Sequence, residues 1–484
     1  MTSKRRTNRV VLVNPNRMKP AVAPIALDYL AHALEESGFQ VDVLDLCFTT
    51  DFQHAISEYF SQHGVIAVGV TLRNTDDTYY ASQDFFLPPF KEVTDCLKAH
   101  TSAPIVVGGA GFSIMPEAIL SYCGLDLGIW GEGEHSLPLL IAKIAAGEEF
   151  SSVPALIYRT KRGFHHNIPI FFDLSKFNAR RSIVDNQRYF AEGGMGNIES
   201  KRGCAKKCIY CADPVSKGRQ LRLRSPDSVA DEIESLLEAG VDHFHFCDSE
   251  FNLPQIHAQE VCLKLIERGL GERIRWYAYT SPVPFSDELA TLFRKAGCAG
   301  IDFGVDSGTD EMLYALGRDF QTEELKRTAE VCHRQGIIFM YDLLLGGPGE
   351  TRKSLRQGIE TMKRLSPSRV GAALGVRIFP NTRLAELVRE QGSMAENVNL
   401  RGAVIGNENF FAPIFYLSAA LGADAEAYLA ELVNGDERFF IGSKEGVDKN
   451  YNYNENTRLV KAIKAGYRGA FWDILRRIAE KDEL

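Results

Sequence analysis

The stretch RGCAKKCIYC, residues 202–211, decides how this chain is understood, because it places three of the ten cysteines of the chain within eight positions. Cys204, Cys208 and Cys211 have the spacing C-x3-C-x2-C, and the two lysines between the first pair would help to stabilise thiolates. Three soft ligands in one loop suit iron–sulfur or zinc chemistry. The other seven cysteines are scattered singly in apolar or helical stretches, where a thiol behaves as a small hydrophobe.

Zinc is the alternative to a cluster at these three cysteines. A structural zinc site needs four tetrahedral ligands, which usually come from two C-x2-C or H-x3-H halves. The sequence offers no second half, although His243 and His245, two positions apart on one predicted strand, could supply a ligand. A cubane cluster needs only three cysteines and then leaves one iron free to bind a substrate. The spacing therefore favours the iron–sulfur cluster.

Strands and amphipathic helices alternate after this loop. Ser225 and Pro226 begin the first helix well, with serine as the cap and proline in the first turn. Six such βα units predict an open parallel barrel, whose active site lies at the carboxyl ends of its strands. The predicted strands span residues 196–200, 241–247, 275–279, 300–303, 337–345 and 370–378.

The first 150 residues show the same alternation and predict a separate, Rossmann-like parallel sheet. Apolar residues at helical spacing from Leu27 to Leu34, closed by Gly38, predict a crossover helix between the first two strands. In such sheets ligands bind beyond the carboxyl ends of the strands. Glycine-rich strand ends also occur in ordinary turns, so the loops alone do not decide between a ligand site and structural turns. The strands are predicted at 10–13, 41–46, 65–70, 105–107 and 127–130, and the polar loops at 14–15, 71–77, 108–113 and 131–134.

Composition sets the wider limits. Hydrophobic residues make up 45% and charged residues 24% of the 484 residues, which predicts an ordinary globular protein of about three units. The net charge of -8 disfavours a broad basic face for nucleic acid. We predict a Rossmann-like domain at 1–150, a connector with a small hairpin at 151–190, the barrel at 191–390 and a mainly helical C-terminal domain at 391–484.

No segment of the sequence has the features of a membrane span or a secretory signal. The longest mostly apolar stretch, Phe410 to Ala423, is shorter than the roughly 20 residues that a spanning helix needs. The basic start is followed by only four apolar residues, Val10 to Val13, too few for a signal peptide. The last four residues spell an endoplasmic-reticulum retention signal, which has no meaning without an entry signal. We predict a cytoplasmic protein.

The cysteine spacing, with Tyr210 before the last cysteine and a six-unit barrel around it, resembles the radical S-adenosylmethionine (SAM) superfamily. The resemblance implies a 4Fe–4S cluster on Cys204, Cys208 and Cys211. In that family the open iron chelates the amino and carboxylate groups of SAM, and an electron from the reduced cluster cleaves SAM to a 5'-deoxyadenosyl radical. An electron donor such as flavodoxin or ferredoxin would supply that electron.

Three further segments resemble the SAM-contacting parts of this superfamily, in the right order. Residues 248–252 resemble the segment at the SAM amino group, residues 304–308 lie where ribose contacts are made, and residues 345–351 resemble the adenine-side loop. Each segment alone is weak evidence for a SAM contact, since Gly-Pro-Gly and Asp-Ser-Gly also occur in ordinary turns. The implied SAM contacts are Tyr210, Asp248, Ser249, Glu250, Asp306, Ser307, Gly346 and Gly347.

The N-terminal sheet ahead of this barrel resembles the cobalamin-binding class of the superfamily. The resemblance implies corrin contacts in the loops 108–113 and 131–134, at Gly108, Gly109, Gly111, Ser113, Glu132 and Gly133. Residues 1–150 lack the D-x-H-x-x-G motif whose histidine ligates cobalt in many cobalamin domains. We therefore expect no histidine ligand, and we place Arg73 and Asn74 beside the lower axial face of the corrin without ligation.

The resemblance implies a methylase that acts on an unactivated carbon, or on phosphorus, of a small-molecule substrate. One SAM would methylate cob(I)alamin and a second would yield the radical that removes a hydrogen atom from the substrate. Two alternatives stay open: radical ring formation or rearrangement without methyl transfer, and a non-catalytic corrinoid or cluster carrier. We leave the substrate residues unassigned; residues 410–423 and the loop 451–456 could enclose a substrate, and the C-terminal helices could close the barrel mouth.

Overall fold

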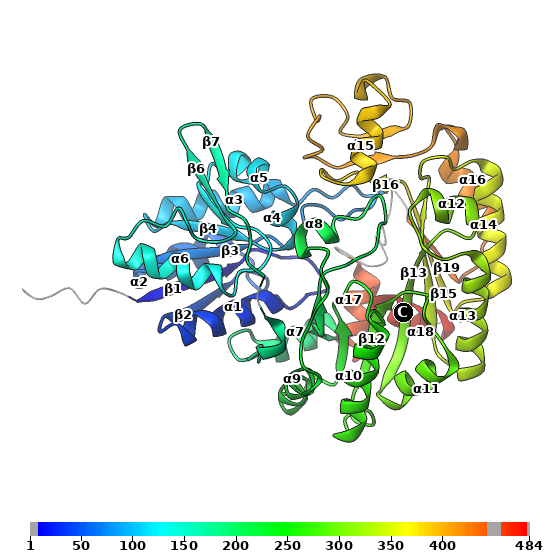
Figure 1. Cartoon of the computed structure of the whole chain (residues 1–484), viewed down its shortest axis with the longest axis horizontal. Helices are drawn as coiled ribbons and strands as arrows, with labels where there is room; N and C mark the ends of the chain where they lie inside the picture. Colours follow the sequence, from blue (N-terminus) through cyan, green and yellow to red (C-terminus); the bar gives the residue numbers. More distant parts are fainter. Residues whose placement is uncertain (1–7, 172, 443–455, 482–484) are drawn as a thin grey trace, which may run out of the picture.

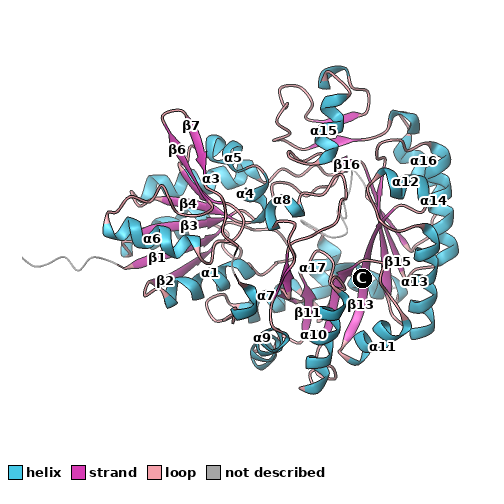
Figure 2. Cartoon of the chain, in the orientation of Figure 1, coloured by secondary structure: helices cyan, strands magenta, loops and turns pink. Residues whose placement is uncertain are grey.

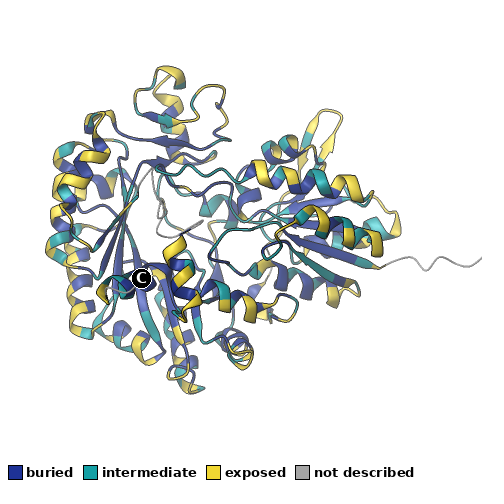
Figure 3. Cartoon of the chain, turned by 180° about the vertical axis from the view of Figure 1, so that it is seen from behind, coloured by how far each residue is buried: buried dark blue, intermediate teal, exposed yellow. Residues whose placement is uncertain are grey.

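The chain forms two units that lie side by side, each built on a sheet of mainly parallel strands flanked by helices (Figures 1 and 2). The computed structural model describes residues 8–171, 173–442 and 456–481. Most of the strands are buried along most of their length, whereas the helices expose their outer faces (Figure 3). This burial follows from continuous apolar runs such as Val10–Val13, which are typical of parallel strands covered on both faces.

The N-terminal sheet has the strand order β2-β1-β3-β4-β5-β6-β7. The first five strands are parallel, and the hairpin of β6 and β7 extends the sheet in antiparallel fashion. The chain turns to opposite sides after β1, so the ligand crevice of such a sheet lies between β1 and β3. The strands are β1 (Arg9–Asn14), β2 (Gln40–Asp45), β3 (Ala67–Thr71), β4 (Ile105–Gly108), β5 (Leu127–Ile129), β6 (Leu156–Thr160) and β7 (Gly163–His166).

Six helices accompany this sheet, and the crossover helix predicted between the first two strands is confirmed as α1 (Ile25–Glu36). Its buried positions, Leu27, Ala31 and Leu34 among them, recur at helical spacing and face the sheet. The other five are α2 (Phe52–Gln62), α3 (Leu87–His100), α4 (Ala110–Ile114), α5 (Pro116–Cys123) and α6 (Ser136–Ala146).

The second sheet is the open barrel, with the order β19-β15-β14-β13-β12-β11-β8 and all its pairs parallel. The six predicted strands are confirmed, and a seventh, β19 (Phe439–Ile441), joins the edge of β15. That strand is only three residues long, which leaves little pattern for a prediction. The six are β8 (Gly196–Ile198), β11 (His243–Phe246), β12 (Arg275–Thr280), β13 (Cys298–Asp306), β14 (Phe339–Leu345) and β15 (Arg369–Leu374).

Amphipathic helices cover the outside of the barrel. The predicted start of the first one is confirmed, because Ser225 Oγ accepts the backbone N–H of Ser228 at 3.1 Å and Pro226 occupies the first turn. That helix is α9 (Pro226–Glu238). The other helices between residues 186 and 365 are α7 (Asn186–Gly193), α8 (Asp213–Lys217), α10 (Gln255–Glu267), α11 (Asp287–Lys295), α12 (Asp310–Ala315), α13 (Thr322–Gln335) and α14 (Arg352–Leu365).

The C-terminal helices lie beneath the barrel, so the expectation that they close its mouth is wrong. Trp472 and Ile474 of α18 pack with Tyr277 and Met340, which are inner residues near the amino ends of β12 and β14. The last two helices of the chain are each apolar on one side only. They bury these apolar sides against the floor of the barrel. These helices are α17 (Thr457–Lys464) and α18 (Phe471–Glu480).

A small lobe near residues 376–418 lies on the mouth side instead (Figure 1). The apolar segment 410–423 contributes a buried strand to it rather than a helix, and the loop 451–455 lies outside the described residues. The lobe consists of β16 (Val376–Arg377), α15 (Arg383–Glu390), β17 (Leu400–Gly402) and β18 (Ile414–Tyr416), and α16 (Ala425–Val433) follows it. Within the described ranges, no helix is long and apolar enough to span a bilayer.

Candidate functional site

The cysteine loop begins at a short hairpin of β9 (Lys201–Arg202) and β10 (Arg222–Leu223), directly after β8. Gly203 makes this possible, because its φ is +93° and a Cβ atom there would lie 2.1 Å from the carbonyl oxygen of Gln220. All three thiols then line one cavity at the carboxyl end of the barrel. Their arrangement in one loop fits a cluster with three protein ligands.

Arg318 places a cation directly beside these thiols. Its Nη1 donates to the Sγ of Cys208 at 2.9 Å, and its guanidinium lies 3.4 Å from Asp306 and 3.5 Å from Glu250. Burial raises the pKa of Cys208 to about 11, and Arg318 opposes that rise. A guanidinium at this position favours the thiolate that a metal ligand must be.

Tyr210, Glu250 and Asp306, three of the predicted SAM contacts, are brought together around Arg318. The hydroxyl of Tyr210 donates to Asp306 at 2.6 Å, and all three side chains line the same cavity. Asp306 has a φ of +66° at an irregularity of β13, so the backbone is bent to aim this carboxylate. Burial raises the pKa of Glu250 to about 7.

The other predicted SAM contacts have different surroundings. Asp248 does not line the cavity; its carboxylate accepts from the backbone N–H of Ser200 at 2.9 Å and fixes the start of the cysteine loop. Ser249 lines the cavity and donates to Asp213. Ser307, Gly346 and Gly347 lie outside the cavity lining.

The cavity between the cysteine loop and the barrel strands has a volume of about 390 Å³. One of its walls comes from the N-terminal unit, through residues 77–79 of the loop that follows β3. An ion pair of 2.8 Å between Asp76 and Arg377, both buried, fixes that loop to the mouth-side lobe. Residues from both units therefore enclose the same space.

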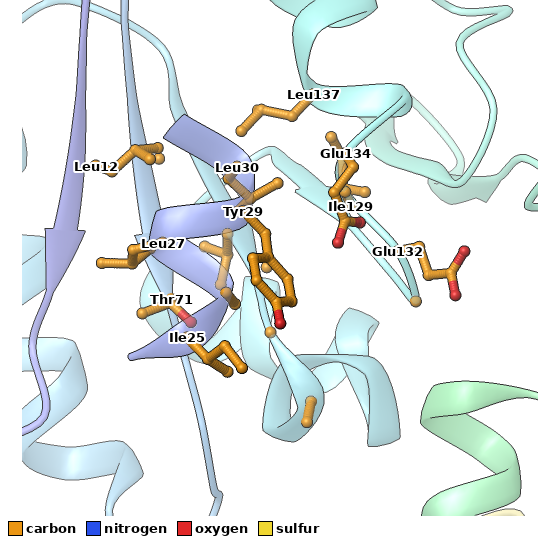
Figure 4. A pocket seen from close by; sticks show the side chains of 18 of the residues that line it. Leu12, Ile25, Leu27, Tyr29, Leu30, Thr71, Ile129, Glu132, Glu134 and Leu137 are labelled. Atoms are coloured by element: carbon orange, nitrogen blue, oxygen red, sulfur yellow. The ribbon is translucent and has the colours of Figure 1, made fainter. Parts of the chain in front are cut away.

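A second, largely apolar cavity of about 190 Å³ lies between the N-terminal sheet, α1 and α6 (Figure 4). Leu27 and Leu30 from α1 line it together with Ile129 and Leu137. At the strand ends it reaches the backbone of the loops predicted to contact the corrin. Gly108, Gly109, Glu132 and Gly133 line it, whereas Gly111 and Ser113 do not.

Gly111 and Ser113 act within the loop instead. A Cβ atom on Gly111 would lie 2.9 Å from the backbone of Asn74, so the glycine permits the two strand-end loops to touch. The hydroxyl of Ser113 accepts from the N–H of Gly131 at 2.8 Å and donates to the carbonyl of Gly109. Both residues hold the loops at the strand ends in place.

Arg73 and Asn74 line a neighbouring cavity of about 420 Å³, on the other side of the strand ends. The Nη1 atom of Arg73 is buried and has no hydrogen-bond partner among the described residues. A buried donor of this kind is uncommon in a folded protein unless a ligand or water completes it. The position of Arg73 fits a residue that faces a bound group.

Buried ion pairs join the loop 131–134, which is predicted to contact the corrin, to the cysteine loop. Arg202 lies 2.6 Å from Glu134 and 2.7 Å from Glu199, and Glu132 also pairs with Arg202 and Arg222. Although burial opposes ionisation, Arg202 holds the pKa of Glu134 below its ordinary value. Glu132, which was predicted to contact the corrin, contacts these two arginines of the barrel unit.

Several residues of the site could not be identified from sequence patterns. Arg318 follows α12 without a motif, and Tyr279 and Asp342 sit inside strands where only their alternation with apolar neighbours sets them apart. Asp77 is the last residue of the polar loop predicted at 71–77, Thr78 and Tyr79 follow it, and no sequence pattern connects them to the barrel. Contacts between distant segments bring these residues to the cavity.

Comparisons with known proteins agree with this geometry. Residues 198–362 match the radical SAM superfamily, and residues 16–141 match the B12 binding domain. The chain is 34% identical over 450 residues to the tryptophan 2-C-methyltransferase of Streptomyces laurentii, a match that covers 80% of this chain and 75% of the relative. The chain belongs to the cobalamin-binding radical SAM methyltransferases.

Solved structures of this family have the same fold. The radical SAM methyltransferase TsrM of Kitasatospora setae, with tryptophan and a SAM analogue bound, superposes with a TM-score of 0.92 at 32% identity over 98% of each chain. A second structure of that enzyme, with cobalamin and a 4Fe–4S cluster bound, gives 0.90 at 31% identity.

These relatives confirm the predicted fold, the enzyme class and the three cofactors, namely a 4Fe–4S cluster, SAM and cobalamin. They also favour methyl transfer to carbon over the carrier and over a radical reaction without methyl transfer.

Proposed function

We propose that this radical SAM methyltransferase acts on a carbon atom of an aromatic amino acid, with tryptophan as the first candidate. The observation that carries this proposal is the cavity of about 390 Å³ that the cysteine loop, the barrel strands and residues 77–79 of the cobalamin-type unit enclose together. A substrate in it would be within reach of both cofactor units. The name and bound ligand of the two relatives support the choice of tryptophan.

Residues of the barrel unit would bind the cluster and SAM, and residues of the N-terminal unit would bind the corrinoid. When bound, the cluster, SAM and cobalamin supply the methyl group and the electron chemistry. Cys204, Cys208 and Cys211 would hold the cluster, and Arg318 would stabilise the thiolates beside Glu250. The glycine-rich strand ends and the apolar cavity of Figure 4 would hold the corrinoid.

Two further expectations belong to this proposal. An electron donor such as flavodoxin or ferredoxin would serve the cluster, and the protein would act in the cytoplasm. If such a donor serves the cluster, product should form without a chemical reductant only when the donor protein is present.

Arg73 would face the lower side of the corrin without ligating cobalt. Its buried, unpartnered Nη1 supports this placement. Replacing Arg73 by Ala should change the absorption spectrum and the affinity of bound hydroxocobalamin. An unchanged spectrum and affinity would contradict the placement.

The test of the proposed function is mass spectrometry of the anaerobically reconstituted protein with hydroxocobalamin, SAM, tryptophan and a reductant. We expect methylated tryptophan together with S-adenosylhomocysteine, and the loss of both with Cys208→Ala because the cluster loses a ligand. Cys262→Ala, which removes a thiol buried in the barrel core, is the control for cysteine loss as such. S-adenosylhomocysteine in excess of the bound cobalamin, without methylated tryptophan, would mean another acceptor, because methylation of the cobalamin itself yields only one equivalent. The amount of 5'-deoxyadenosine would report whether SAM is also cleaved to a radical.

A further inference from the structure

The inner face of β13 carries a carboxyl group that the cofactor-binding residues do not use. Ile301, Phe303 and Val305 are buried in the core between strands and helices, so Asp302 and Gly304 point into the barrel. Gly304 lines the cavity, and a Cβ atom placed on it would meet no atom of the described residues within 4 Å. Among the described residues, space therefore opens at Gly304, the next inner position after Asp302, whereas Asp302 itself lies just outside the cavity lining.

Asp302 is 3% exposed, and its Oδ1 has no hydrogen-bond partner among the described residues. Its backbone pairs with Tyr279 on one side and Met340 on the other. Burial, and then the carboxyls of Asp342 and Glu250, raise the pKa of Asp302 well above its ordinary value. A buried polar group without a partner is costly, which points to a ligand that completes it.

Asp342 stands next to it on β14. It pairs with Gly304 in the strand register, so its side chain lies one step above Asp302, and it lines the cavity. The acidic residues on the cluster side have cations of their own: Arg318 serves Glu250 and Asp306, and Lys217 lies 3.0 Å from Asp213. In the described part of the chain, no lysine, arginine or histidine forms an ion pair with Asp302.

We propose that Asp302 and Asp342 bind the protonated amino group of the substrate. This inference rests on the proposed function and specifies which feature of the amino acid the barrel recognises. An ammonium group has three donors, enough to serve both carboxyl groups, and hydrogen bonds between opposite charges are the strong ones. Binding of the cation also favours ionisation of Asp302, because it supplies the positive charge that the described residues do not place beside this carboxyl group.

The barrel fixes the direction of the bound substrate. Below Asp302 the floor is closed by Met340 and Tyr277, which pack on Trp472 of α18. The amino group is therefore the deepest part of the substrate. The rest extends past Gly304, where none of the described side chains obstructs it, towards Tyr79 and the cysteine loop.

The test uses the reconstituted holoenzyme with SAM and three indoles: tryptophan, tryptamine, which keeps only the amine, and indole-3-propionate, which keeps only the carboxylate. We expect the wild type to methylate tryptophan and tryptamine and to leave indole-3-propionate untouched. Asp302→Asn and Asp342→Asn should each raise the KM for tryptophan tenfold or more, with the KM for SAM unchanged. Asp287→Asn, at an exposed aspartate of α11, is the matched control.

Equal methylation of indole-3-propionate and tryptamine would overturn the inference. So would an unchanged KM for tryptophan in both variants, or a rise in the KM for SAM instead, since SAM also carries an amine. Asparagine closely matches a protonated aspartate in shape, so the variants should fold, and unfolding midpoints equal to the wild type would verify this.

A failure of the proposed function has a different signature. If the wild type methylates no indole, calorimetric titration of tryptamine into the SAM-loaded holoenzyme decides the inference. Binding by the wild type that Asp302→Asn weakens tenfold or more would support the amine site while tryptophan methylation fails. No binding of tryptamine to the wild type would overturn it.

Discussion

Glu350 shows at the residue scale how a buried acid can hold a predicted ligand loop. It follows the glycine-rich turn at Gly346 and Gly347, accepts the backbone N–H of Gly346, and is 2% exposed. Burial raises its pKa to about 7, against the smaller opposing effect of the two backbone donors. The glycines were predictable from the sequence as a turn, whereas the state of this carboxyl depends on what packs around it.

The consequence is a pH-dependent stability term that Glu350→Gln should remove. The folded protein binds this proton more tightly than the unfolded chain, so stability falls as pH rises from the unfolded pKa towards the folded one. Between pH 5.5 and 8 the wild type should lose about 2 kcal/mol more than Glu350→Gln. Urea unfolding of both apoproteins at the two pH values measures the difference, and parallel pH profiles would contradict the assignment.

At the scale of elements, the strands and the cysteine loop were predictable, and the placement of the last two helices was not. The apolar runs of the strands and the one-sided pattern of α18 are local properties. Which surface α18 covers is decided by the barrel floor, formed by inner residues of β12 and β14 that are more than a hundred residues away in the chain. The amphipathic pattern alone fits the mouth of the barrel equally well.

Replacing Ile474 by Ala tests whether α18 supports the floor. Ile474 is fully buried between the helix and the barrel, so its truncation should cost about 2–5 kcal/mol of unfolding free energy. Ile256→Ala is the matched control, because Ile256 is 69% exposed on α10 and its truncation should stay within about 0.5 kcal/mol. Equal effects of the two substitutions in urea unfolding would mean that α18 is not packed as described.

At the scale of the whole molecule, buried charges decide how the two units meet. Arg202 precedes the cysteine loop and lies 2.6 Å from Glu134 in the loop 131–134, which is predicted to contact the corrin, with both side chains less than a tenth exposed. A buried pair of this kind contributes little net stability relative to apolar groups but is expensive to break. Its position between the two cofactor loops makes it a determinant of their relative placement.

Arg202→Gln should therefore cost about 3–5 kcal/mol of stability, because it leaves the carboxylates of Glu134 and Glu199 buried without their cation. Adding Glu134→Gln should recover part of that loss, with a coupling of about 0.5–3 kcal/mol in a double-mutant cycle. Arg334→Gln, at an exposed pair with Asp287, should cost at most about 1 kcal/mol. Strictly additive costs for Arg202 and Glu134 would show that the two are not coupled.

The amino-acid sequence by itself determined the cysteine spacing, the two series of parallel strands and, through them, the fold, because these features depend on local composition and short-range periodicity. The cofactors followed from the resemblance of these motifs to a known family. Only the tertiary structure decided which side chains meet. Arg318 reaches Cys208 across 110 positions, Arg377 reaches Asp76 across 301, and the described residues leave space beside Asp302 because its neighbour on the inner face is a glycine. Such contacts depend on how barrel and sheet are packed, and no local pattern encodes them.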